Sequence, residues 1–258
     1  MNYELIKNVI NVDNLDISYI TNNKNDSKTL LFVHGWKADK YNLSSIYSHL
    51  LKEFNIISID LPGFGESSMP TNDFGSPEYA NIVAFFLKKL NFEKVVCIGH
   101  SFGGKIGILL SIFYPDLIEK LVLINSAGIK QKRGLNWYLK VWSFKFMKFI
   151  HKKLTKDEEL LIKLKNNFGS DDYRNAGALR SIFLKVVNED YTNILGNVKC
   201  PTFIYWGEKD NATPLWMAKK LNNLIKDSGL YIVAGGGHFS FLDDDRIIDI
   251  IRVFCNSL

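Results

Sequence analysis

Short apolar segments alternate with longer stretches of helical periodicity along most of the chain. The apolar segments are nearly continuous runs of Val, Ile, Leu and Phe between turn residues, a pattern typical of parallel strands that are covered on both faces. We expect such buried strands at residues 29–34, 55–60, 94–98, 120–125, 201–206 and 230–234. Two further extended stretches, 4–12 and 15–20, predict a leading hairpin with Asp13 and Asn14 in its turn.

The stretches between these strands carry the periodicity of helices. We expect helices at residues 41–52, 77–90, 102–114, 215–226 and 243–257. Ser76 before Pro77 is a typical helix start, with an N-cap residue followed by proline. Because strands and helices alternate, the sequence predicts an α/β fold with an open, doubly wound, mostly parallel sheet.

One interval breaks the alternation. Residues 129–196 contain helix-like stretches and no convincing strand, so we expect a helical insertion there, between core segments 1–128 and 197–258. The charge distribution singles out the same interval. The whole chain of 258 residues has a net charge of +5, whereas residues 129–196 hold 14 basic and 7 acidic residues, a net of +7.

Composition excludes several classes of protein. The basic residues are 27 lysines and 5 arginines, which is a poor match to nucleic-acid-binding proteins, so we expect no nucleic-acid partner. No apolar run approaches the ~20 residues of a membrane span, and no secretory signal opens the chain. We therefore expect a cytoplasmic protein without stable membrane insertion. The three cysteines are scattered and the histidines are not paired at metal-ligand spacing, so we expect neither a metal nor a cofactor.

The strand at 94–98 runs directly into Gly99-His100-Ser101-Phe102-Gly103, and a helix follows. This is G-x-S-x-G between a strand and a helix, in which the serine occupies a sharp turn with its hydroxyl exposed above the sheet. Gly99 and Gly103 crowd the same space and must lack side chains. The pattern predicts that Ser101 is a nucleophile; the alternative is a glycine-rich turn that only caps a helix.

A serine nucleophile needs a base, and the base needs a carboxylate that orients it. His238 follows three glycines just after the last expected strand, where a loop can fold back over the serine. Asp210 follows the strand at 201–206, with Glu208 as its rival. The order serine, aspartate, histidine is the one found in α/β hydrolases. The alternatives are that His238 is an exposed loop residue and that Asp210 only caps the next helix.

With these residues the chain resembles the α/β-hydrolase family. The matching blocks are His34-Gly35-Trp36, Asp60-Leu61-Pro62-Gly63-Phe64-Gly65-Glu66-Ser67, GHSFGG at 99–104, WGEKD at 206–210 and GGGHF at 235–239. The resemblance implies eight strands, a helical cap at 129–196, and an oxyanion hole formed by the backbone amides of Trp36 and Phe102. His34 and Asp60 are further catalytic candidates, and the alternative that we favour is that both are structural and shape the loops beside the oxyanion hole. Some family members carry the acid after the sixth strand, but Asn125-Ser126-Ala127 offers no carboxylate there, which favours Asp210.

These residues predict a serine hydrolase that acts on a carboxylic ester, or a related acyl small molecule, through an acyl-enzyme. Hydrolases of carbon–carbon bonds in dienone acids share the fold and triad and rank second. They commonly have Trp after the histidine and Asn before the serine, where this chain has Phe239 and His100. A non-catalytic member that only binds a ligand is the third possibility.

The expected insertion bears on substrate choice. Residues 135–154 combine aromatic side chains with lysines and fit an amphipathic helix that roofs an apolar pocket. A lid that contacts a membrane surface, and lysines that receive an anionic substrate group, are the alternatives. The sequence leaves the natural substrate and the oligomeric state open.

Overall fold

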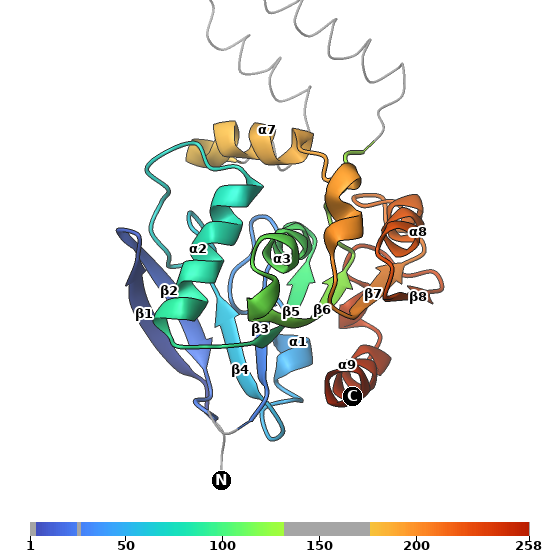
Figure 1. The fold of residues 1–258 in the computed structure, drawn as a ribbon, viewed down its shortest axis with the longest axis horizontal. Coiled ribbons are helices and arrows are strands. Elements are labelled where there is room, and N and C mark those ends of the chain that lie inside the picture. The colour runs from blue at the N-terminus through green and yellow to red at the C-terminus, as the bar shows by residue number, and fades with distance from the viewer. Residues whose placement is uncertain (1–3, 25–26, 132–175, 258) are drawn as a thin grey trace, which may run out of the picture. The chain divides into compact units, whose positions relative to one another are not determined.

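The computed structural model describes residues 4–24, 27–131 and 176–257. Their strands form one eight-stranded sheet in the order β1-β2-β4-β3-β5-β6-β7-β8 (Figure 1). The strands are β1 (Ile6–Val12), β2 (Leu15–Thr21), β3 (Thr29–Val33), β4 (Asn55–Ile59), β5 (Val95–His100), β6 (Ile118–Ile124), β7 (Thr202–Gly207) and β8 (Ser228–Val233). The pairs β1–β2 and β2–β4 are antiparallel and the others are parallel. The sheet expected from the sequence is confirmed.

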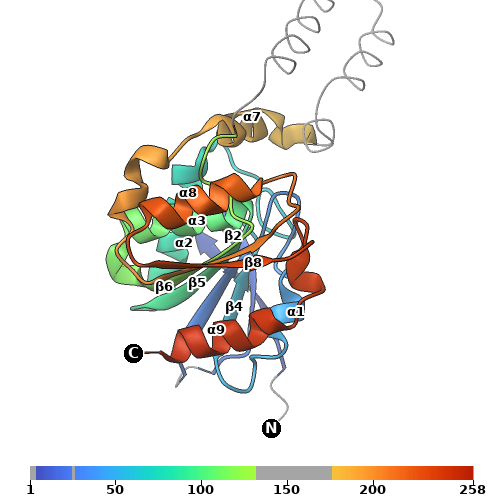
Figure 2. The same ribbon diagram turned by 90° about the vertical axis from the view of Figure 1, so that its right-hand side faces the viewer.

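Helices cover both faces of this sheet. Figure 2 shows α2 (Ser76–Lys89), α3 (Phe102–Phe113) and α8 (Leu215–Leu224) on one face. The short α1 (Ser44–Tyr47) and the C-terminal α9 (Arg246–Asn256) lie on the other. Every residue of β3 and β4 is buried, which explains why these strands read as uninterrupted apolar runs.

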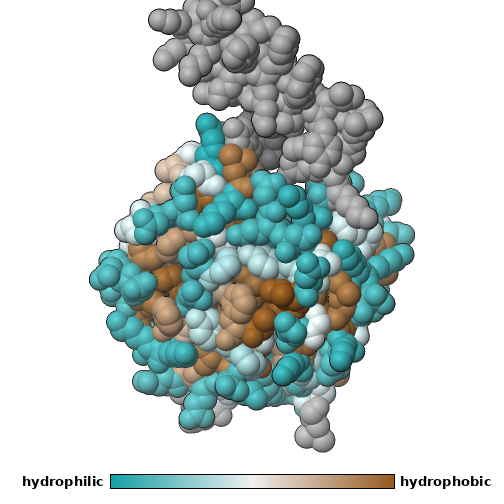
Figure 3. Space-filling model, turned by 45° about the horizontal axis from the view of Figure 1, so that its top comes forward, coloured by the Kyte–Doolittle hydropathy of each residue, from teal (hydrophilic) through white to brown (hydrophobic). Residues whose placement is uncertain are grey.

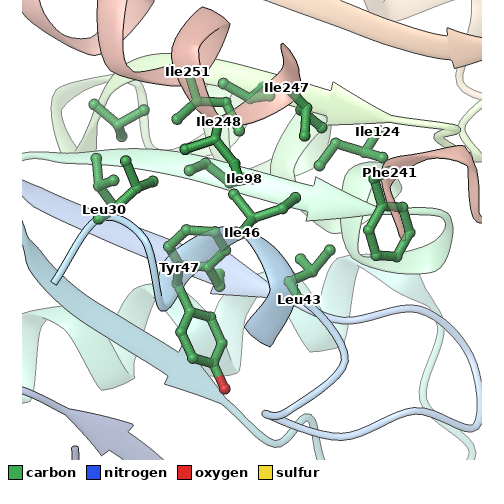
Figure 4. Close-up of a cluster of buried hydrophobic side chains, with 14 of the residues drawn as sticks. Leu30, Leu43, Ile46, Tyr47, Ile98, Ile124, Phe241, Ile247, Ile248 and Ile251 are labelled. Atoms are coloured by element: carbon green, nitrogen blue, oxygen red, sulfur yellow. The ribbon is translucent and has the colours of Figure 1, made fainter. Parts of the chain in front are cut away.

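The core between the sheet and α9 is built mainly from aliphatic side chains, with aromatic rings such as those of Tyr47 and Phe241 among them (Figure 4). Ile247, Ile248 and Ile251 of α9 are buried there. Two lysines bind the other end of this helix: Lys120 Nζ donates to the carbonyl oxygens of Phe254 (2.8 Å) and Ser257 (2.6 Å), and Lys28 Nζ donates to that of Cys255 (2.6 Å). Carbonyls that a helix end leaves without partners are thus satisfied by cations, which also suit the helix dipole.

The predicted helix at 41–52 is wrong in extent, because only Ser44–Tyr47 is α-helical. Its apolar periodicity is real, since Leu43, Ile46, Tyr47 and Leu50 are all buried. The backbone forms successive tight turns in which an amide bonds the carbonyl three residues earlier, as at Leu50 and Tyr47 (3.0 Å).

Ser76 is not the N-cap of α2 as expected. The cap residue is Gly75, whose amide donates to Glu78 Oε2 (2.5 Å), so the side chain three positions on satisfies it.

The chain divides into two compact units, one of Met1–Lys130 with Glu189–Leu258 and one of Gln131–Asn188. The first contains the whole sheet. The second contains, among its described residues, the 3-10 helix Gly177–Leu179 and α7 (Arg180–Asn188). Most of the predicted cap of 129–196, with its amphipathic stretch at 135–154, lies outside the described residues. The cap and its role in substrate choice therefore stay predictions.

In the described parts of the chain, no helix is both long and apolar enough to cross a bilayer. Figure 3 shows one face of the molecule, on which brown apolar residues lie in small groups between teal polar ones. Scattered exposed apolar side chains of this kind are ordinary on globular proteins and call for no partner.

Candidate active site

Ser101 lies between the end of β5 and the first turn of α3, in a strained backbone conformation with φ of 52° and ψ of −111°. The two flanking glycines leave no room for a side chain. A Cβ on Gly99 would lie 2.4 Å from the carbonyl oxygen of Gly103, and one on Gly103 would lie 2.1 Å from that of Val33. The chain therefore reaches the sharp turn that the G-x-S-x-G spacing predicts, with Ser101 at the N-terminus of a helix.

The loop after β3 lies against this turn. A Cβ on Gly35 would come within 3.3 Å of Ser101 Cβ, so the backbone of the loop passes close to the serine. The next residue, Trp36, packs edge-on against Phe102 at the start of α3, with ring centroids 5.6 Å apart. The two amides expected to form the oxyanion hole are thus carried by segments that contact each other beside Ser101.

Asp210 and His238 form a close pair, with Oδ2 of the aspartate 2.8 Å from Nδ1 of the imidazole. The Asp210 side chain is fully buried, whereas that of His238 is 18% exposed. Burial opposes ionisation of Asp210. Hydrogen bonds from His238 and Thr213 outweigh it, so the pKa of this carboxyl lies below its ordinary value. A buried, ionised carboxylate on Nδ1 leaves Nε2 as the nitrogen that can accept a proton.

Two neutral residues complete the surroundings of Asp210. Asn125 Nδ2, directly after β6, and the hydroxyl of Thr213 each donate to Asp210 Oδ2 at 2.6 Å. The amides of Ala212 and Thr213 donate to the other oxygen at 2.8 and 2.9 Å. With His238, the carboxylate accepts five hydrogen bonds and has no freedom to turn.

The loop that carries His238 is tied to the residue before Ser101. Nε2 of His100 lies 3.1 Å from the carbonyl oxygen of His238, and the two rings pack with centroids 4.8 Å apart. A carbonyl only accepts, so His100 donates through Nε2. Burial lowers the pKa of His100 to about 3, with a smaller contribution from His238, and this ring is neutral at ordinary pH. The structure thus pairs Asp210 with His238 and places the His238 loop against His100, the residue before Ser101.

Comparison with known proteins bears on the family of the chain. A family model described as alpha/beta hydrolase fold matches residues 28–157, half of the chain. The chain belongs to the α/β hydrolase fold family. Its sheet order, the turn at Ser101 after β5 and the loop of His238 after β8 belong to that fold.

The curated relatives of this α/β hydrolase include hydrolases of more than one kind. The pimeloyl-[acyl-carrier protein] methyl ester esterase of Wigglesworthia glossinidia brevipalpis is 27% identical, over 88% of this chain and 93% of the relative. The 2-hydroxy-6-oxo-6-(2'-aminophenyl)hexa-2,4-dienoic acid hydrolase of Metapseudomonas resinovorans is 24% identical, over 92% and 86%. The solved structure of a membrane phospholipase A is similar with a TM-score of 0.78 at 23% identity, over 97% and 85%, which shows the fold alone. The protein is a hydrolase, and the bond it cleaves is a separate question.

The remaining titratable residues that the sequence singles out have structural contacts. Glu208, the rival of Asp210, accepts a hydrogen bond from the amide of Gly235 (2.8 Å) and so shapes the loop before His238. Nε2 of His34 accepts one from the amide of Leu61 (3.0 Å). In the described part of the chain, no group of three or more His, Cys, Asp and Glu side chains could hold a metal ion.

A buried lysine lies one helical turn beyond the nucleophile. Lys105 is 4% exposed and its Nζ lies 3.6 Å from Oε2 of Glu189, whose carboxylate also accepts from the amide of Ser76 (3.0 Å). Burial lowers the pKa of Lys105 to about 8 against the opposing effect of Glu189. This pair links α3 to the start of α2 and to the segment that returns to the core after α7.

Sequence reasoning did not find Asn125 or Thr213 as functional residues. In the sequence, Asn125 stands out only as a position without a carboxylate, and Thr213 does not stand out. A signal was available for Asn125, because β6 and β7 are parallel neighbours and the residues that follow them meet at one edge of the sheet.

Proposed function

We propose that this protein is a serine hydrolase that cleaves a carboxylic ester, or a related acyl small molecule, through an acyl-enzyme. The observation that carries the proposal is the Asp210–His238 pair, whose loop packs on His100 directly before Ser101. A strained serine at a helix N-terminus, next to an imidazole held by a buried carboxylate, is an arrangement that a ligand-binding protein does not need.

In the proposed reaction, the hydroxyl of Ser101 attacks the carbonyl carbon of the substrate and His238 Nε2 takes its proton. Asp210 holds the Nδ1–H and stabilises the imidazolium that forms. The oxyanion lies against the amides of Trp36 and Phe102, where the N-terminus of α3 adds a favourable dipole. The tetrahedral intermediate expels the alcohol, which receives the proton from His238. A water molecule, activated by the same histidine, then cleaves the acyl-enzyme.

A carbon–carbon hydrolase is the second candidate, and the dienoic acid hydrolase among the relatives favours it. That chemistry could use the same three side chains. Ester hydrolysis ranks first because His100 and Phe239 stand where carbon–carbon hydrolases of this fold commonly have asparagine and tryptophan. Both candidates imply a small-molecule substrate and neither requires a metal.

The test has two parts. The first is labelling with a fluorophosphonate followed by peptide mass spectrometry, which we expect to place the label on Ser101 and to lose it in Ser101→Ala. The second is a comparison of kcat/KM across acyl esters, lactones and dienone acids. The proposal is refuted if the wild-type protein is not labelled and turns over none of these compounds. Turnover of dienone acids alone would favour the second candidate instead.

A further inference from the structure

A buried cation lies at the far end of the loop that contacts the nucleophile. Lys40 is 1% exposed, and its Nζ lies 2.7 Å from Oδ2 of Asp60, which is fully buried. The same Nζ lies 2.7 Å from Oε2 of Glu66, whose side chain is 52% exposed. A buried ion pair is poor evidence for stability, because desolvation offsets most of its attraction, so its location calls for another explanation.

The ion pair joins the loops that leave two neighbouring parallel strands. Lys40 belongs to the loop after β3, and Asp60 directly follows β4. The amide of Lys40 donates to Asp60 Oδ1 (2.6 Å), while the carbonyl of Lys40 accepts from the hydroxyl of Ser58 (2.6 Å). The backbone and the ammonium group of Lys40 are therefore all fixed to the end of β4.

The β4 loop closes around the same carboxylate. The amide of Glu66 donates to Asp60 Oδ2 (2.9 Å), and Gly65 has φ of 54°. A Cβ on Gly65 would lie 2.3 Å from Cγ of Asp60, so only glycine fits there. This wrapping leaves Asp60 rigid and makes it a firm anchor for Lys40.

The other end of the β3 loop is anchored to the β4 loop as well. His34 Nε2 accepts from the amide of Leu61 (3.0 Å), and the backbone at Gly35 passes close to Ser101. Trp36 lies between this end of the loop and Lys40, and its ring packs against Phe64 of the β4 loop with centroids 4.9 Å apart. The segment from 34 to 40 is thus held at both ends, with the amide of Trp36 between them.

We propose that Lys40 is a positioning residue: its ion pair with Asp60 sets the place of the Trp36 amide relative to Ser101, and so the geometry of the oxyanion hole. This inference rests on the proposed function. Lys40 does not touch the substrate and acts only through the loop. Removal of one oxyanion donor costs about 10²–10³ in turnover, and a displacement of about 1 Å can cost about 10². A loosened loop should therefore lower kcat by about 10- to 100-fold.

The ion pair has the protonation state that this role needs. Burial disfavours the charged form of Lys40, but its hydrogen bonds to Asp60 and Glu66 outweigh that effect and raise the pKa of the ammonium group. The hydrogen bonds from Lys40 and Lys7 lower the pKa of Glu66 to about 2. Lys40 and Glu66 stay ionised through the working range, so neither should add a limb to the pH–rate profile.

The experiment compares Lys40→Met with the matched control Lys7→Met. Lys7 pairs with the same Glu66 at 2.9 Å, but its side chain is 54% exposed and no hydrogen bond joins it to the β3 loop. The double variant Lys40→Met with Asp60→Asn is measured in parallel, because it leaves no unpaired buried charge and is the safer of the two to fold. All assays are run well below the melting temperature of each variant.

Two readouts separate positioning from a merely structural role. One is kcat against KM for an ester that the wild type turns over. The other is the ratio of the inhibition constants of a methyl ketone and its trifluoromethyl analogue, since only the latter forms a tetrahedral oxyanion on the serine. We expect the folded Lys40 variants to lose about 10- to 100-fold in kcat and in this ratio, with KM within about threefold. Lys7→Met should match the wild type.

The inference is overturned if a folded Lys40 variant has the same kcat and the same ratio of ketone inhibition constants as the wild type, even if its melting temperature falls. Failure of both Lys40 variants to fold would also overturn it, because Lys40 would then be a structural residue. A failure of the proposed function would appear differently, as a wild-type protein that neither turns over esters nor binds the trifluoromethyl ketone.

Discussion

Replacing Asp210 by asparagine removes one charge and replaces one of the two acceptor oxygens by an NH₂ donor, at a site where several donors already converge. Three donors converge on Oδ2 of Asp210, from His238, Asn125 and Thr213, and two backbone amides converge on Oδ1. An asparagine has one acceptor oxygen. If this oxygen takes the two backbone amides, its NH₂ group faces the donors that Oδ2 accepted before.

Only a change of tautomer resolves this conflict at His238. The NH₂ group must donate to Nδ1, so the ring proton moves to Nε2, the nitrogen that has to receive the proton of Ser101. We therefore expect Asp210→Asn to lower kcat by about 10⁴ with little change in KM. The amide of Asn125 and the hydroxyl of Thr213 lose a charged acceptor as well, which should destabilise the fold by about 1–3 kcal/mol.

The assay is steady-state ester hydrolysis together with urea denaturation, with Glu208→Gln as the control. Glu208 bonds only the loop amide of Gly235, so this variant should retain turnover within a few-fold of the wild type. A nearly active Asp210→Asn beside an inactive Glu208→Gln would refute the reasoning and make Glu208 the acid.

Three further predictions concern the nucleophile and two buried lysines. Ser101→Ala should lower ester turnover by several orders of magnitude and leave the melting temperature close to that of the wild type, as measured by kinetics and calorimetry. Lys120→Met removes the cation from the end of α9 and should cost about 2 kcal/mol in urea denaturation, more than the exposed control Lys7→Met. Burial lowers the pKa of Lys105 from 10.5 to about 8 in the folded protein. Above pH 8 the unfolded chain therefore binds more protons than the folded one, and the free energy of unfolding rises with pH up to about 10.5. The free energy of unfolding of wild type relative to Lys105→Met should increase by on the order of 3 kcal/mol between pH 7 and 10.5; a constant difference would contradict the lowered pKa.

The sheet could be predicted from the sequence because its strands are buried on both faces. All eight expected strands are present, and their ends are displaced by about two residues at most. The helix expected at 41–52 failed for a physical reason. Apolar periodicity reports which side of a segment is buried, and a series of tight turns buries the same side as a helix does.

The candidate site was only partly predictable. Ser101, Asp210 and His238 were found because each carries chemistry at the end of an expected strand. Asn125 was missed because an amide has no chemistry of its own until a carboxylate lies beside it. Lys40 was missed because it is one of 27 lysines, and only the tertiary structure shows that it is buried.

The residues that sequence reasoning missed share one property: each joins two loops. Lys40 joins the loops after β3 and β4, and Asn125 joins those after β6 and β7. His100 joins the nucleophile turn to the loop after β8. The core that α9 covers is made of other residues. Substitutions at these three residues should therefore lower kcat while unfolding stays cooperative. They release one loop from its neighbour, whereas the sheet beneath stays packed.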